Sequence, residues 1–250
     1  MKFIWVFATL GLGLIAGLTG CESPNTATRP SIRPDYPPEW QARWMKRHEE
    51  FVARAGEGGI EVLFLGDSIT DYWRDRGRAV WDRDFAPLHA ANFGISGDRT
   101  QQVLWRITHG ELEGIEPRVV VLMIGTNNTG PGLGENSLTP ANTTPEIVAG
   151  VRAIVRTIQR KLPATRVLLF GIFPRGETND PLRKQIAEIN AGIARLADGQ
   201  KVFFRDISAD LLGADGSLSK EIMPDLLHPN QQGYEIWSRT LRSSLAQLLN

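Results

Sequence analysis

The sequence predicts an α/β fold, a three-layer α/β/α sandwich around a five-stranded parallel sheet. Two patterns indicate the sandwich. Short, continuous apolar runs, typical of strands buried on both faces, recur along the chain. Longer segments with helical periodicity lie between them, and this alternation is typical of βαβ units. A chain of 250 residues has room for one such domain with appendages.

The composition narrows the classes of function. Lys plus Arg and Asp plus Glu balance at 28 each, so the net charge gives no reason to expect a nucleic-acid partner. Cys21 is the only cysteine, which excludes a disulfide within the chain. Four histidines and one cysteine also leave little material for a zinc site.

The N-terminus has the pattern of an export signal. Lys2 precedes an apolar stretch over residues 3–20, and Leu-Thr-Gly-Cys at 18–21 resembles the lipobox of bacterial lipoproteins. We therefore predict a lipoprotein signal peptide over residues 1–20 and lipidation of Cys21. The alternative is an uncleaved anchor, since a membrane span needs roughly 20 apolar residues. Both interpretations predict an exported domain held at a bacterial membrane, on the periplasmic or cell-surface face.

The domain boundaries follow from a change in composition. Five of the fifteen prolines lie in residues 22–38, so we predict an extended tether over residues 21–38. An amphipathic pattern begins at Glu39 and predicts a helix laid over the core. One folded domain over residues 39–250 is expected, without internal repeats.

The elements of that domain are predicted from periodicity. The strands are expected at 62–65, 90–93, 119–124, 167–170 and 202–204, and the helices at 100–107, 145–161, 182–196 and 231–249. Polar, glycine-rich segments follow the first four strands (GDS, GISGDRT, GTNN and FPRGE), and DLLHPN precedes the last helix. Parallel strands end at the same edge of a sheet, where ligands bind in open α/β folds. These segments therefore predict a site at that edge.

Ser68, in the first of these segments, is a candidate nucleophile if a base can reach it. Of the four histidines, His48 lies on a helix that looks exposed, whereas His228 directly precedes the last helix. Asp225, three residues before His228, could accept its Nδ1 hydrogen and leave Nε2 facing Ser68, as in a Ser-His-Asp triad. The alternative is that Asp225 caps the helix and the histidine is incidental.

Acyl transfer also requires hydrogen-bond donors for a developing oxyanion. Gly97 could bring its backbone N–H close to a ligand, although a plain glycine turn would look the same. Asn127 offers a side-chain amide, with Asn128 as a competing candidate; either could instead satisfy the backbone of its own loop.

The segments GDSIT, NFGISGD, GTNN and DLLHPN resemble the four blocks of the SGNH (GDSL) hydrolases, esterases with a flavodoxin-like sheet. Residues 60–250 are similar to the catalytic subunits of brain-type platelet-activating-factor acetylhydrolase. The resemblance implies that Ser68 is the nucleophile and the first oxyanion donor, through its backbone N–H. Gly97 and Asn127 would be the other donors, and Asp225 and His228 would complete the triad.

The resemblance implies no metal and no organic cofactor, and it leaves a homodimer open because the animal relatives pair. The chain departs from that branch at position 96, where Ser96 replaces a glycine. Bulky residues at Ile69, Thr126 and Leu227 match the acyl pocket of the branch and predict a preference for short acyl groups such as acetyl. The expected substrate is a small ester, an acetylated carbohydrate or lipid.

Other interpretations remain open at this point. Within enzymes, these are a broader carboxylesterase, a lysophospholipase or a thioesterase. A non-catalytic, lipid-anchored binding module could use the same fold. A nucleotide or flavin binder is disfavoured because neither G-x-G-x-x-G nor G-x-x-x-x-G-K-[ST] follows any strand. Trp73, Trp81 and Trp105 are candidates to stack a sugar, although such aromatic residues more often pack in the core.

Overall fold

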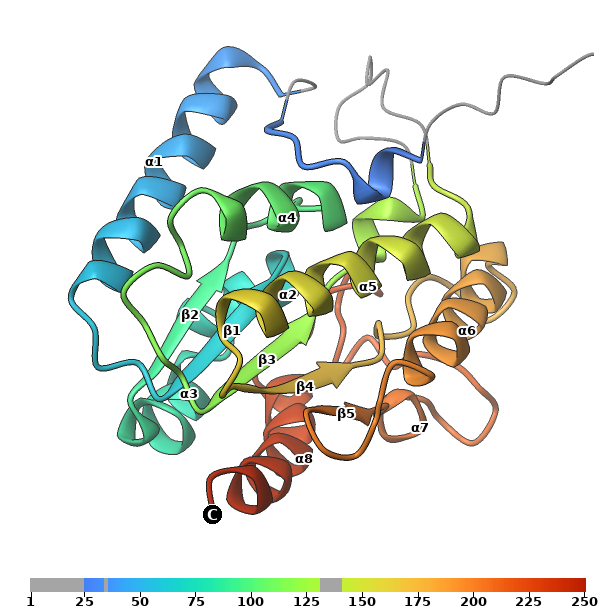
Figure 1. The fold of residues 1–250 in the computed structure, drawn as a ribbon. Coiled ribbons are helices and arrows are strands. Elements are labelled where there is room, and N and C mark those ends of the chain that lie inside the picture. Colours follow the sequence, from blue (N-terminus) through green and yellow to red (C-terminus); the bar gives the residue numbers. More distant parts are fainter. Residues whose placement is uncertain (1–24, 34–35, 131–140) are drawn as a thin grey trace, which may run out of the picture.

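The computed structural model describes residues 25–33, 36–130 and 141–250 (Figure 1). Five strands form one sheet in the order β2-β1-β3-β4-β5, and every neighbouring pair is parallel. This confirms the predicted sheet. The strands are β1 (Val62–Gly66), β2 (Ala90–Gly94), β3 (Val119–Met123), β4 (Arg166–Phe170) and β5 (Val202–Arg205).

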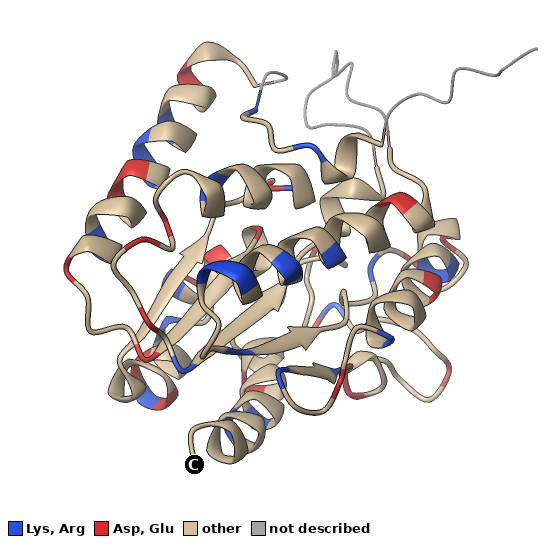
Figure 2. Ribbon diagram, viewed as in Figure 1, with Lys and Arg blue, Asp and Glu red and all other residues tan. Residues whose placement is uncertain are grey.

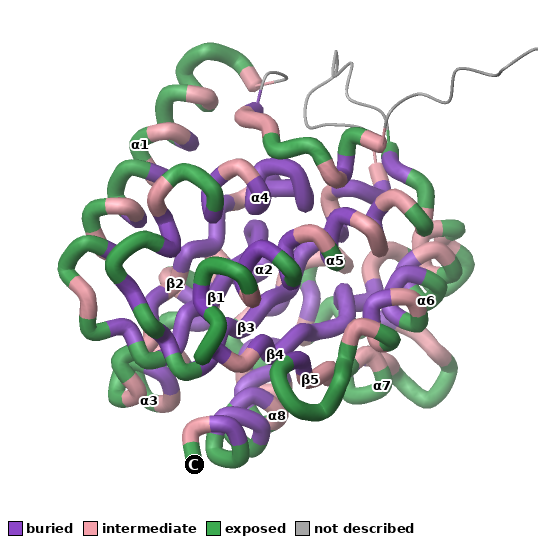
Figure 3. The backbone as a smooth tube through the Cα atoms, viewed as in Figure 1, coloured by how far each residue is buried: buried purple, intermediate pink, exposed green. Residues whose placement is uncertain are grey.

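Helices cover both faces of the sheet, so the core has two halves (Figures 1 and 3). Successive strand residues such as Leu63 and Phe64 point to opposite faces, as the two-residue period of a strand requires. One face packs against α1 (Pro38–Gly56), α4 (Thr100–Thr108), α5 (Thr144–Lys161) and α6 (Pro181–Ala194). The other packs against α3 (Arg78–Asp84), α7 (Ser208–Leu211) and α8 (Gln231–Leu248).

The longest helices begin where their sequences contain start signals. Thr143 and Glu146 form a capping box at the start of α5, where Pro145 also sits in the first turn. The Asn230 side chain accepts the N–H of Gly233 and caps α8. Figure 2 marks the positions of basic and acidic residues along the helices, including a row of basic residues on α5.

The packing of the N-terminal segment, residues 25–33, differs from the extended tether predicted there. The 3-10 helix η1 (Thr26–Thr28) packs on α4 and α5, and Ala27 is completely buried. The Thr100 hydroxyl donates to the Ala27 carbonyl at 2.8 Å, and Arg33 is only 1% exposed. Prolines exclude a regular helix here but do not prevent packing, so residues 25–33 belong to the domain surface. The predicted signal peptide and Cys21 lie outside the described residues.

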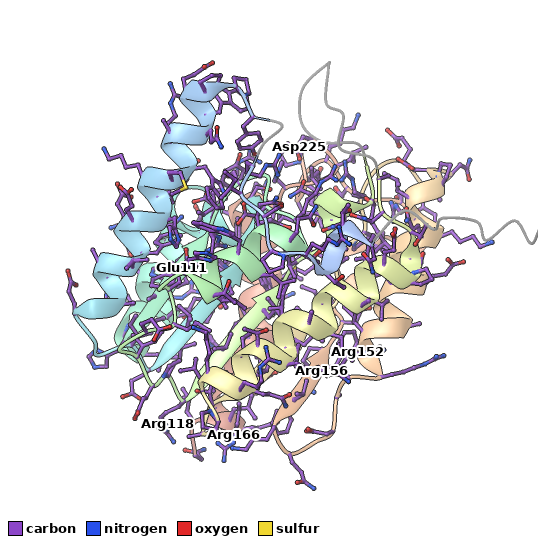
Figure 4. The ribbon with its side chains drawn as sticks, turned by 45° about the horizontal axis from the view of Figure 1, so that its top comes forward. Glu111, Arg118, Arg152, Arg156, Arg166 and Asp225 are labelled. Carbon is purple, nitrogen blue, oxygen red and sulfur yellow. The ribbon has the colours of Figure 1, made fainter. Side chains whose placement is uncertain are left out.

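The exposed position predicted for His48 is wrong. The His48 ring lies on the buried face of α1, and its Nδ1 is 3.0 Å from Oε1 of the Glu111 carboxylate. Arg106, itself fully buried, joins Glu111 to Asp98 through charge-assisted hydrogen bonds. Figure 4 shows Glu111 beside α1. Among the helices of the described residues, none is long and apolar enough to cross a bilayer.

Candidate active site

The polar segments meet at the carboxyl edge of the sheet. In Figure 4, Asp225 lies at the end of the molecule opposite Arg118 and Arg166, which stand at the starts of β3 and β4. The chain leaves β1 toward β2 on one side and later returns to β3 on the other, so β1 and β3 flank the topological switch point. Ligands in open α/β sheets bind at this position.

The turn after β1 explains why the strand ends in glycine. A Cβ at Gly66 would lie 2.5 Å from the Met123 carbonyl oxygen and closer still to the Thr70 hydroxyl, so only glycine fits. Asp67 caps the short helix α2 (Ser68–Asp71), its Oδ1 accepting the Ile69 N–H at 3.0 Å. Ser68 is thereby the first residue of α2.

Ser68, His228 and Asp225 form a continuous hydrogen-bonded chain. Ser68 Oγ lies 2.9 Å from His228 Nε2, and His228 Nδ1 lies 2.7 Å from Asp225 Oδ2. Asp225 Oδ1 accepts the backbone N–H groups of His228 at 2.7 Å and Leu227 at 3.1 Å. Asp225 does not cap α8, since Asn230 does so. One oxygen of Asp225 closes the turn before the helix, and the other orients the imidazole.

At this edge of the sheet the pKa of one carboxyl group is lowered and the pKa of another is raised. Partial burial works to raise the pKa of Asp225, but hydrogen bonds from the backbone and imidazole of His228 and from the Leu227 N–H lower that pKa to about 2. Asp225 is thus an anion at any working pH. Complete burial raises the pKa of Asp67 to about 7, against the effect of the Ile69 N–H. Asp67 therefore changes charge near neutral pH.

The candidate oxyanion donors line the same cleft as Ser68 and His228. Gly97 is buried with φ of 83°, in the left-handed region that favours glycine. The Asn127 amide donates to the Asp98 carbonyl at 2.9 Å, and an amide has a second hydrogen with which it can reach a ligand.

Asn128, the competing candidate, points away from the cleft into the protein. It is completely buried, and its Oδ1 accepts the Thr100 N–H at 3.0 Å. Its amide nitrogen contacts three acceptors, the side chains of Thr100, Gln101 and Asn142. Asn128 therefore holds its loop together, which leaves Asn127 to face the ligand.

The cleft has a volume of about 430 Å³, and α1 with the residues just before it forms one wall. Leu227, one of the three residues predicted for the acyl pocket, lines it, whereas Ile69 and Thr126 are buried beside the site, 1% and 2% exposed. The complete lining is Tyr36, Trp40, Arg43, Trp44, Arg47, Ser68, Asp71, Tyr72, Ile95, Ser96, Gly97, Asn127, Leu227 and His228.

The aromatic residues of the cleft are not those singled out in the sequence. Trp73 is completely buried, Trp81 packs against Phe64 with centroids 4.9 Å apart, and Trp105 stacks on a histidine. The cleft instead presents Trp40, 48% exposed, with two tyrosines. An apolar side chain left outside the packed face of α1 is the signal that could have found it. In the described part of the chain, no three His, Cys, Asp or Glu residues are grouped to hold a metal ion.

Comparison with known proteins places this chain in a family. The GDSL-like lipase/acylhydrolase family matches residues 64–236. Platelet-activating factor acetylhydrolase IB subunit alpha1 from Homo sapiens is 37% identical over 90% of this chain and 91% of its own length. Subunit alpha2 from Rattus norvegicus is 37% identical over 83% of this chain and 85% of its own length.

Solved structures share the fold at lower identity. Axe2, an acetylxylan esterase from Geobacillus stearothermophilus, aligns with a TM-score of 0.59 and 20% identity, over 76% of this chain and 94% of its own. The family match over residues 64–236 is consistent with the parallel sheet and with the serine just after β1. The chain therefore belongs to the GDSL-like lipase/acylhydrolase (SGNH) family and is a hydrolase of ester bonds.

Proposed function

We propose that the protein is a serine esterase that removes short acyl groups, acetyl above all, from a small ester. The observation that carries the proposal is the chain of two hydrogen bonds from Ser68 Oγ through His228 to Asp225. A serine hydroxyl is a weak nucleophile on its own, and a hydrogen-bonded imidazole held by a carboxylate is the arrangement that activates it.

The catalytic cycle follows from this geometry. His228 Nε2 takes the proton of Ser68 as Oγ bonds to the ester carbonyl carbon, and the carbonyl oxygen becomes an oxyanion. The backbone N–H groups of Ser68 and Gly97 and the Asn127 amide donate to that oxyanion. The C–O bond to the alcohol then breaks, and the departing alkoxide takes the proton from His228. Water, activated in the same way, hydrolyses the acyl-enzyme and restores Ser68.

The packing around Ser68 supports a short acyl group. Ile69 follows the serine and is buried. Thr126, beside Asn127, is also buried, with its oxygens 3.4 Å from the Arg175 guanidinium. These positions are filled by protein, so the open volume lies on the side of α1, where the alcohol half would fit. The relatives at 37% identity carry the name acetylhydrolase, which agrees with this proposal.

Two experiments test the proposal. A fluorophosphonate probe should label the protein, and Ser68→Ala should abolish labelling while Ser243→Ala, an exposed serine on α8, should not. A binding module without catalysis would show no labelling. In a series of p-nitrophenyl esters from about two to twelve carbons, kcat/KM should be highest at the shortest acyl groups. A maximum at eight carbons or longer would identify a broader carboxylesterase or lysophospholipase instead.

We also propose that the domain acts at a membrane surface through a lipid on Cys21. The support is the pattern of the sequence: an apolar stretch over residues 3–20 and a lipobox ending at the only cysteine. Expression in a bacterium should give a protein that partitions into detergent and carries a lipid on its N-terminal peptide. Cys21→Ala should move it into the aqueous phase, and equal partitioning of the two would contradict the proposal.

A further inference from the structure

The loop between β2 and α4, residues 95–99, carries one proposed oxyanion donor and supports another. Residues that precede the sheet, in the N-terminal segment and in α1, contact this loop at three points. We propose that Arg33, Tyr36 and Trp44 are positioning residues of the oxyanion hole. They hold this loop so that the Gly97 N–H and the Asn127 amide point at the reacting carbonyl. The inference rests on the proposed esterase function and extends it to residues that precede the sheet.

Gly97 needs such support because of its conformation. Its φ of 83° suits glycine, but glycine reaches many other conformations at little cost. A peptide plane that can rotate would point the N–H away from the oxyanion for part of the time. Pre-organised donors stabilise the transition state because they need no rearrangement during the reaction. Contacts from outside the loop must therefore fix the planes on both sides of Gly97.

Tyr36 fixes the plane before Gly97. Its hydroxyl donates to the Ser96 carbonyl oxygen at 3.3 Å. In a trans peptide the carbonyl of one residue and the N–H of the next point in opposite directions. Holding the Ser96 carbonyl toward Tyr36 therefore turns the Gly97 N–H the other way. Asp71 Oδ2 also holds Ser96, since it accepts the Ser96 hydroxyl at 2.7 Å and the Ser96 N–H at 3.2 Å.

Arg33 fixes the plane after Gly97. Its guanidinium donates to the Gly97 carbonyl oxygen. The Asp98 N–H, on the other side of the same plane, donates to the Ile95 carbonyl at 3.2 Å. Arg33 is 1% exposed and its guanidinium carbon lies 3.8 Å from the centre of the Tyr36 ring. The two clamping side chains therefore also hold each other.

Trp44 connects α1 to the third donor through Asp98. Its indole N–H donates to Asp98 Oδ1 at 2.7 Å, and Arg106 Nε donates to Asp98 Oδ2 at 2.8 Å. The carbonyl oxygen of the same aspartate accepts the Asn127 amide at 2.9 Å. Asp98 is completely buried, so its position is fixed by these contacts. The orientation of Asn127 depends in this way on a tryptophan of α1.

The test uses the full chain with Tyr36→Phe, Arg33→Gln and Arg33→Lys, and with Arg29→Gln as the matched control. Arg29 lies in the same segment but is exposed. Misplacing a catalytic group by about 1 Å can cost on the order of a hundredfold in rate. We expect Tyr36→Phe and Arg33→Gln to lower kcat for p-nitrophenyl acetate by about tenfold to a hundredfold with KM nearly unchanged. Arg33→Lys should recover part of the loss, and Arg29→Gln should match the wild type.

A boronic acid that mimics the tetrahedral intermediate provides the second readout. Its affinity should fall in each variant in proportion to kcat/KM, which a merely structural role would not cause. Unchanged kcat in folded Tyr36→Phe would overturn the inference, and so would a loss of kcat without a loss of boronate affinity. Tyr36→Phe removes one oxygen only, so it tests the inference even if Arg33→Gln does not fold. Inactivity of the wild type toward every acyl ester and the fluorophosphonate would instead refute the esterase function.

Discussion

The hydroxyl of Tyr234 donates a hydrogen bond of 2.7 Å to the carbonyl oxygen of Ile69. Tyr234 lies in the first turn of α8, shortly after His228, and Ile69 follows Ser68 in α2. Burial raises the pKa of Tyr234 well above its usual range, so the phenol remains a donor at every working pH. This bond therefore joins the turn that carries the nucleophile to the helix that follows the base.

Tyr234→Phe should weaken this connection. The Ile69 carbonyl would lose a buried donor, at a cost of about 1–3 kcal/mol in the free energy of unfolding. We also expect kcat to fall severalfold, because Ser68 and His228 would be held together less firmly. Urea unfolding and steady-state kinetics measure the two effects. Ser243→Ala, a hydroxyl deletion on the exposed side of α8, serves as the control, and equal behaviour of both variants would contradict the role of the bond.

Asp225→Asn should leave the fold intact and remove most of the activity. An amide can still accept the backbone N–H groups of Leu227 and His228, but it no longer stabilises an imidazolium or selects the correct tautomer. The expected loss in kcat is on the order of 10⁴, the value for the corresponding change in a serine protease. Asp215→Asn is the matched control, since Asp215 closes an exposed turn in the same manner. Near-normal turnover of Asp225→Asn would exclude the triad.

Asn127→Ala and Asn128→Ala should separate catalysis from stability. Loss of an oxyanion donor in Asn127→Ala should cost about 10²–10³ in kcat with a small change in stability. Asn128→Ala should instead lower the free energy of unfolding by about 1–3 kcal/mol, because it leaves buried partners unsatisfied. Circular dichroism during urea unfolding and initial rates measure the pair. The reverse pattern would assign the donor to Asn128.

Asp67→Asn should change the pH dependence of stability. The pKa of Asp67 is raised from 3.8 to about 7 in the folded protein, so the folded state binds the extra proton between these values. The contribution of protonated Asp67 to the free energy of unfolding is complete below pH 3.8 and is lost as the pH rises through about 7. Asp98 raises this pKa further and Arg175 opposes it.

The amide introduced by Asp67→Asn cannot ionise, but its oxygen can still accept the Ile69 N–H and cap α2. The variant should therefore be more stable than the wild type at pH 8, by on the order of a few kcal/mol, and the difference should shrink toward about pH 4. Urea unfolding of both proteins at several pH values measures it. A difference that is constant across this range would show that Asp67 does not titrate there.

The sheet and the position of Ser68 at its edge could be predicted because their signals are local. Apolar runs such as Val62–Leu65 have one stable environment, a strand covered on both faces, and parallel strands deliver the segments that follow them to one edge. That rule places Ser68 at the edge, but His228 follows no strand directly. Its pairing with Ser68 across 160 residues was predicted from the resemblance to the SGNH hydrolases.

The contacts of Arg33, Tyr36 and Trp44 with the loop after β2 could not be predicted in the same way. The prolines near Arg33 indicate an extended chain but not whether it packs. His48 is flanked by charged residues on both sides, which conceals its place one turn after Trp44 on the buried face of α1. Such contacts depend on which loop lies beneath the segment, and that is a property of the tertiary fold.

The packing of the N-terminal segment determines where the chain can be shortened. A version that begins at residue 39, where the sequence alone suggests that folding starts, would omit Arg33 and Tyr36 and with them two contacts to the loop of Gly97. A version that begins at residue 25 retains both, together with the buried Ala27. A shortened enzyme prepared for assay or crystallisation should therefore keep this stretch.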